Sequence, residues 1–133
     1  MTVTTNDAPT TRALILTGVV AAVVAAAATT AVAAVGHAAG ISLDVSGEPI
    51  PVAGFASLTL AFSLIGLALA VGIRRFTAHP RTVFVRTTVA LTVLSFVPDV
   101  FADAEVATRL LLMVTHTVAA SIVIPAISRQ LPD

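Results

Sequence analysis

The chain has 133 residues, of which 57% are hydrophobic and only 11% are charged, and its formal net charge is zero. Soluble domains carry about 25% charged residues, so this composition is typical of a membrane protein. The chain has no cysteine, which excludes disulfides, thiolate nucleophiles and cysteine-ligated metal clusters. No basic patch carries interleaved aromatic residues, so we expect no nucleic-acid partner.

The first apolar run follows a polar beginning. Residues 1–11 are polar and lack periodicity, which predicts a disordered cytoplasmic tail. The run over residues 13–35 is long enough to cross a hydrocarbon core about 30 Å thick. A cleaved signal peptide is the alternative, because Arg12 precedes the run and the sequence around Ala31 to Ala33 resembles a cleavage site. The length of the run favours a membrane span.

Small residues recur at every fourth position of this first run. Such a stripe lets another helix backbone approach closely, which is how membrane helices pack. We expect the stripe to pack against helices of the same chain, and a homo-oligomer interface is the alternative. Its members are Gly18, Ala22, Ala26, Thr30, Ala34 and Ala38.

Three further apolar runs predict membrane spans over about residues 52–73, 82–101 and 109–127. A glycine- and proline-rich loop over residues 36–51 separates the first two spans. Pro98 leaves open whether the third helix ends, kinks or continues there. The fold class we predict is all-α: residues 12–133 form one multi-pass domain of four transmembrane helices in two antiparallel hairpins.

The charged residues separate by sign between the predicted loops. One side has Arg12, Arg74, Arg75, Arg81, Arg86 and Arg129, whereas the other has Asp44, Glu48, Asp103 and Glu105. Arg109 is the exception on the acidic side. By the positive-inside rule, both termini are predicted to be cytoplasmic, in a chain located in the plasma membrane.

Asp99 and His116 are ionisable residues inside predicted spans. Asp99 follows Arg86 by 13 positions and His116 precedes Arg129 by 13, so both are predicted at one depth, about 20 Å from the arginines. Ionisable residues inside a span are costly and are candidates for function. Three interpretations stay open: a hydrogen-bonded pair that joins the third helix to the fourth, a site that handles protons or a cation, or two unconnected residues.

Two clusters outside the spans could bind ligands. The acidic loops carry oxygen ligands and one imidazole that could hold a divalent cation, at His37, Asp44, Glu48, Asp103 and Glu105. Their spacing matches no known metal motif, so we expect no bound metal.

Anionic lipid headgroups could bind at Arg74, Arg75, Arg81 and Arg86. No nucleotide-binding or hydrolase motif is present, so we expect no cofactor and no catalytic residue.

Several short motifs stand out in the chain: Arg74-Arg75, Pro80-Arg81, Arg86, residues 94–99, residues 116–120, residues 124–126 and Arg129. In these motifs the chain resembles an uncharacterised family of small actinobacterial four-helix membrane proteins. This resemblance implies a membrane topology and no activity.

Three functions are therefore considered. The first is a structural or accessory helix bundle, partnered in the lipid bilayer by its own copies or by another membrane protein. The alternative is a channel or transporter subunit that handles protons or a cation, which requires a polar path to Asp99 or His116. The third is an enzyme that modifies a lipid or quinone, which requires a lateral cleft open to lipid.

Overall fold

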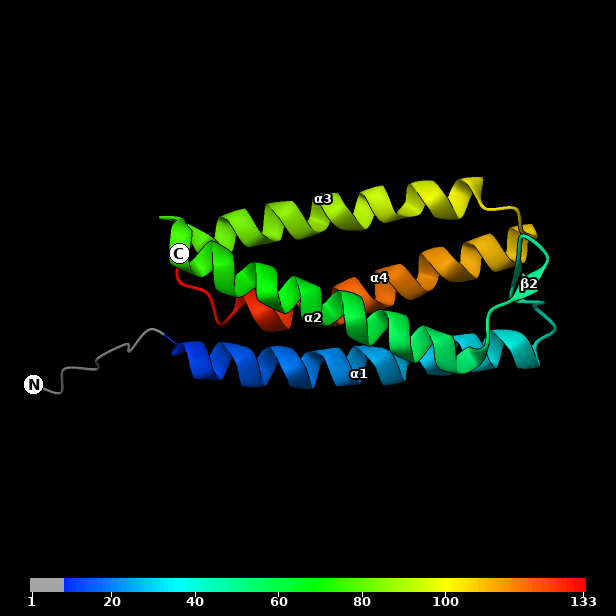
Figure 1. Cartoon of the computed structure of the whole chain (residues 1–133), viewed down its shortest axis with the longest axis horizontal. Helices are drawn as coiled ribbons and strands as arrows, with labels where there is room; N and C mark the ends of the chain where they lie inside the picture. The colour runs from blue at the N-terminus through cyan, green and yellow to red at the C-terminus, as the bar shows by residue number, and fades with distance from the viewer. Residues whose placement is uncertain (1–8) are drawn as a thin grey trace, which may run out of the picture.

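The protein is a bundle of four long helices, and the computed structural model describes residues 9–133. The helices are α1 Thr11–Ala38, α2 Val52–Phe76, α3 Pro80–Phe101 and α4 Val106–Ser128 (Figure 1). At 1.5 Å per residue they are about 33–42 Å long, enough to cross a bilayer. All four are also apolar enough to do so. The predicted all-α fold with four membrane-spanning helices is confirmed.

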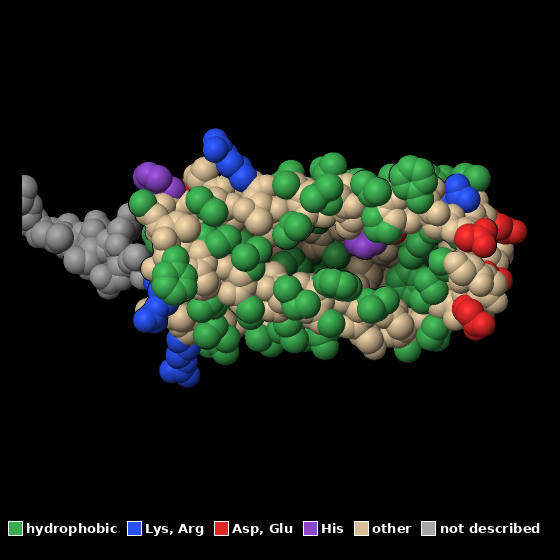
Figure 2. All heavy atoms as spheres, turned by 45° about the horizontal axis from the view of Figure 1, so that its top comes forward, with side chains coloured by type: hydrophobic (Ala, Val, Ile, Leu, Met, Phe, Trp, Pro, Cys, Tyr) green, Lys and Arg blue, Asp and Glu red, His purple; other side chains and the backbone are tan. Residues whose placement is uncertain are grey.

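The two ends of the bundle differ in charge. The start of α1 and the C-terminus lie at one end, and the loop with β2 lies at the other (Figure 1). Figure 2 shows basic side chains gathered at the first end, here called the basic end, and acidic side chains at the opposite, acidic end. The charge separation predicted from the loops is therefore present in three dimensions, and the side of the membrane that each end faces stays a prediction.

The helices extend beyond the predicted spans. Helix α1 begins at Thr11, the last residue of the predicted tail; residues 1–8, on which most of that prediction falls, lie outside the described part of the chain. The Thr10 side chain caps this helix by accepting the Ala13 N–H at 3.1 Å. Pro98 does not end α3, which continues to Phe101.

A short β-hairpin that the sequence did not predict joins α1 to α2. Its strands are β1 Asp44–Val45 and β2 Glu48–Pro49, paired antiparallel. Ser46 and Gly47 connect them with φ of 55° and 80°, as a type I′ turn requires. The Ser46 N–H donates to the Asp103 carbonyl at 2.7 Å. The hairpin is thereby attached to the turn between α3 and α4.

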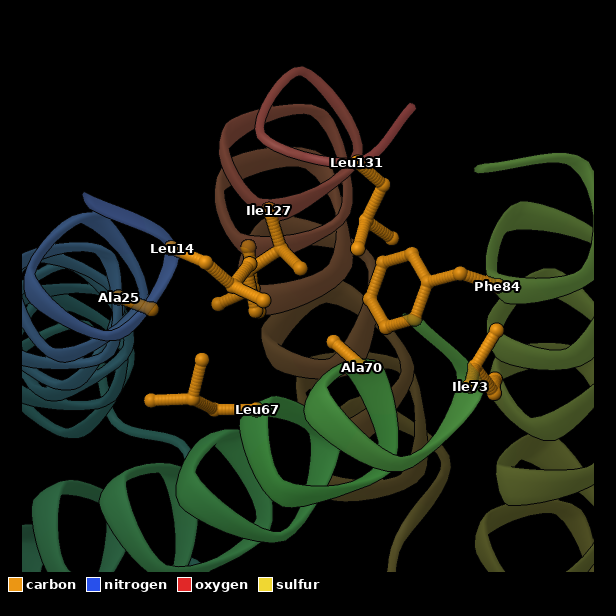
Figure 3. Packing of buried hydrophobic residues seen from close by; sticks show 9 residues of the cluster. Leu14, Ala25, Leu67, Ala70, Ile73, Phe84, Ile127 and Leu131 are labelled. Atoms are coloured by element: carbon orange, nitrogen blue, oxygen red, sulfur yellow. The ribbon is translucent and has the colours of Figure 1, made fainter. Parts of the chain in front are cut away.

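Two apolar clusters form the core. The basic-end cluster takes residues from all four helices and the C-terminal segment: Leu14, Ala25, Leu67, Ala70, Ile73, Phe84, Val123, Ile127 and Leu131. Figure 3 shows the Phe84 ring of α3 pointing into the bundle, between Leu131 and Ala70. The acidic-end cluster is Ala33, Leu43, Phe55 and Leu111, so α3 contributes no residue to it.

The small-residue stripe of α1 is only partly buried. Gly18, Ala22 and Ala26 are buried against the rest of the chain, whereas Ala34 and Ala38 are exposed. A four-residue step overshoots one helical turn by about 40°, so the stripe moves about 160° around the helix between positions 18 and 34. The buried face instead combines steps of three and four residues, through Gly18, Ala22, Ala25, Thr29, Ala33 and Gly36.

Candidate functional site

Asp99 and His116 form a hydrogen-bonded pair between α3 and α4. His116 Nδ1 lies 2.7 Å from Asp99 Oδ2. Asp99 is two residues from the end of α3, whereas His116 is near the middle of α4. The Asp99 side chain is 7% exposed and that of His116 is 42% exposed. One member of the pair is therefore inside the bundle and the other lies partly on its surface.

Asp99 is the last residue of a polar face that runs along α3. Thr88, Thr92 and Ser95 are half-buried, and at 100° per residue they share a face with Phe84 and Asp99. Each hydroxyl donates to a backbone carbonyl of its own helix, at 2.8, 2.8 and 2.6 Å respectively. The opposite side of α3 is exposed and mainly apolar, with Val89, Val93 and Val97 among its residues. Helix α3 thus turns its polar side inward.

The protonation chemistry of the pair follows from its geometry. An ionised carboxylate only accepts hydrogen bonds, so Nδ1 carries the proton whenever Asp99 is charged. The second ring nitrogen, Nε2, then accepts a hydrogen bond in the neutral imidazole and donates one in the imidazolium. The carboxylate also fixes the ring orientation. The arrangement can position an imidazole as a hydrogen-bonding group, or it can accept and release a proton.

The exposed part of His116 lies inside the membrane-spanning part of the surface. His37 is in the last turn of α1 at the acidic end and His79 precedes α3 at the basic end. Figure 2 shows a histidine side chain in a recess within the apolar flank of the bundle, away from both ends. Because His116 lies near the middle of α4 and its side chain is 42% exposed, the imidazole is accessible from the side of the bundle that lipid would cover.

Arg109 also contributes to this region, although its place in the sequence indicated only an exception to the charge rule. Its Nε donates to the Ala104 carbonyl at 2.9 Å and its Nη1 to the Val100 carbonyl at 3.3 Å. The last carbonyls of a helix lack helical partners and attract cations. Arg109 therefore secures the turn that connects α3 to α4. The sequence signal for this role was the position of Arg109 as a single arginine among acidic loop residues.

The acidic loop residues do not form the cation site that was considered. In the described chain, no three His, Cys, Asp or Glu side chains group closely enough to hold a metal ion. His37, Asp44, Glu48, Asp103 and Glu105 are all exposed. The loops are joined by a backbone hydrogen bond, and their acidic side chains remain in solvent.

The arginines proposed for lipid headgroups divide into two kinds. Arg74 donates to the Gln130 carbonyl at 3.3 Å, and Arg81 forms a 3.5 Å ion pair with Asp133. These two attach the C-terminal segment to the helices. Arg75 and Arg86 are exposed, so they are the stronger candidates for headgroup contacts.

The surface also has two shallow hollows between α1 and α4. Each has a volume of about 370 Å³ and is lined almost entirely by apolar atoms. Leu16 and Ile122 line one, and Val35 and Leu111 line the other. Neither reaches Asp99 or His116, so they offer apolar surface without a polar group to recognise a ligand.

A protein-family model matches residues 9–133 of the chain. The chain belongs to DUF6069, a family of unknown function. The DUF6069 match covers the whole described bundle, including the Asp99–His116 pair, but it supplies no activity, and an actinobacterial source stays a prediction. Comparisons with curated proteins and with solved structures give no significant match. The function must therefore be argued from the geometry of the bundle.

Proposed function

We propose that the protein is an accessory membrane protein that works by lateral association in the bilayer, first of all with copies of itself. The observation that carries this proposal is the position of α3 at the edge of the bundle. Only 11% of its most apolar stretch is buried, against 39% for α1. The half of α3 nearer the acidic end is attached to the rest of the bundle by polar contacts. Its outer face is therefore free for a neighbouring chain.

The outer face of α3 has the form of a packing surface. Val89, Val93 and Val97 are 48%, 58% and 51% exposed and follow one another at intervals of four residues. Residues four apart form a ridge that fits the groove of a second helix. Their β-branched side chains have one preferred rotamer in a helix, so little side-chain freedom is lost on contact. The Asp99–His116 bond would keep this ridge in a fixed orientation.

Cross-linking can test this proposal cleanly because the chain has no cysteine of its own. In Val93→Cys, the only thiol would lie on the proposed interface, and we expect a disulfide-linked dimer after mild oxidation in liposomes. Val24→Cys is the matched control, since Val24 lies on α1 and is 50% exposed. Equal cross-linking of both variants, or none at Val93, would contradict the proposal.

A proton- or cation-handling subunit is the second candidate, and the Asp99–His116 hydrogen bond favours it. The basic-end cluster fills the interior between this pair and the basic end of the bundle. A polar path would therefore have to form between copies of the chain. Proton flux into liposomes, compared for the wild type, Asp99→Asn and His116→Ala, decides between the two candidates: flux that both substitutions abolish supports proton transfer.

A further inference from the structure

We infer that His116 is the polar anchor of a lateral binding site for a lipid-soluble molecule that presents a carbonyl or hydroxyl oxygen. The molecule would enter from the bilayer between α2 and α3. All the residues of this site come from one chain, so the inference goes beyond the proposed association and does not depend on it.

The first step is that α2 and α3 separate on the side of the basic-end cluster that faces the acidic end. Gly66 lies within about 20° of Ile73 and about 40° of Ala70 around α2, so it shares their inward face. Ile73 and Ala70 belong to the cluster that contains Phe84 of α3. A Cβ added to Gly66, however, would meet no atom within 4 Å. The inward face of α2 therefore borders open space where it would otherwise contact α3.

The second step is that His116 lies at the same height as this space. Gly66 precedes the end of α2 at Phe76 by ten residues, and His116 precedes the end of α4 at Ser128 by twelve. Counted from the ends of these helices at the basic end of the bundle, the two positions are therefore about 15 and 18 Å along. The recess seen around a histidine in Figure 2 lies in this part of the flank. The side of α3 that shares a face with Phe84 and Asp99 carries the half-buried hydroxyls of Thr88, Thr92 and Ser95.

The third step is the chemistry of the ligand. Asp99 engages Nδ1 and orients the ring, so Nε2 is the nitrogen available to a ligand. A polar nitrogen facing hydrocarbon without a partner costs free energy, and an oxygen-bearing molecule removes this cost. Only a lipid-soluble molecule reaches this depth from the side. A diacylglycerol hydroxyl can donate to Nε2 of the neutral imidazole, whereas a quinone carbonyl only accepts and needs Nε2 to carry a proton. The experiment must therefore separate these two sources.

The imidazole itself can report binding in the wild-type protein. We would label the histidines with ¹⁵N, place the full chain in phosphatidylcholine nanodiscs and assign His116 from its missing signal in His116→Gln. Decylubiquinone, dioleoylglycerol and hexadecane would be added separately. We expect the His116 Nε2 resonance to move with at least one oxygen-bearing probe and not with hexadecane, while His37 and His79 stay unchanged. The responding probe identifies the source, and no response beyond that of hexadecane would overturn the inference.

Two glycines of α2 provide matched variants. A Cβ at Gly66 or at Gly72 meets no atom within 4 Å, so leucine is expected to be tolerated at either position. Gly72 lies about 240° from Gly66 around the helix and so points away from the recess. We expect Gly66→Leu to weaken binding of the responding probe at least tenfold and Gly72→Leu to leave it unchanged. Equal binding by both variants would show that the probe does not occupy the recess.

Discussion

Helices α1 and α3 are attached to the same bundle by different kinds of contact. Helix α1 is buried along its length through small residues, and a Cβ at Gly18 would overlap Leu67 of α2. Helix α3 has only Pro80, Phe84 and Asp99 buried. Its basic half is fixed by the Phe84 ring, and its acidic half by hydrogen bonds that involve Asp99 and Arg109.

This difference shows two ways in which helices associate in lipid. Without a hydrophobic driving force, close backbone approach provides dispersion contacts along the whole helix, as in α1. Hydrogen bonds act at single points and leave the rest of the helix free, as in α3. The first arrangement is suited to a scaffold. The second leaves space beside the helix, and this space contains the half-exposed His116.

The largest effect is expected from disturbing the close packing of α1. Gly18→Leu would force α1 away from α2, because Leu67 already occupies the space beside Gly18. Overpacking of this kind costs about 2–3 kcal/mol. We expect a clear fall in the thermal midpoint measured by circular dichroism in detergent, the method of choice because the chain has no Trp or Tyr. Gly72→Leu should change it little, and equal loss in both variants would contradict the assignment of α1 as the tightly packed helix.

A smaller effect is expected from breaking the polar attachment of α3. A hydrogen bond between two membrane helices contributes a coupling free energy of only about 1 kcal/mol, because its donor and acceptor find other partners when the helices separate. A double-mutant cycle with Asp99→Ala and His116→Ala should therefore give a coupling of about 1 kcal/mol in the free energy of unfolding. The same cycle with Asp99→Ala and His37→Ala should give none. A coupling near zero for the first cycle would mean that the hydrogen bond does not stabilise α3.

The smallest effect is expected at the turn between α3 and α4. Arg109→Gln removes the charged donor to the carbonyls of Val100 and Ala104, and the global cost is expected to stay below about 1 kcal/mol. Hydrogen exchange should instead rise locally over residues 100–106. Arg75→Gln, at an exposed arginine of the basic end, is the control. Unchanged exchange in Arg109→Gln would show that the arginine does not secure the turn.

The spacing of charged residues predicted that Asp99 and His116 share one depth, and the structure joins them at 2.7 Å. Depth follows from counting residues along a helix, but contact also depends on how each helix is rotated and which neighbour it has. For the same reason the packing within the chain that we expected of the four-residue stripe of α1 does not reach Ala34 and Ala38, which are exposed; an interface between copies stays a prediction. The sequence showed which residues are small, whereas the neighbouring helices determined which of them are buried.

Hydropathy and charge along the chain were sufficient to predict four membrane helices and a bundle with one basic and one acidic end. These are local properties, because a bilayer requires about 20 apolar residues to cross it wherever they occur in a chain. The hairpin at Ser46–Gly47, the role of Arg109 and the space beside Gly66 depend on segments distant in sequence. Only the tertiary structure decided them, because they arise from the distances between helices and not from the residues of any one helix.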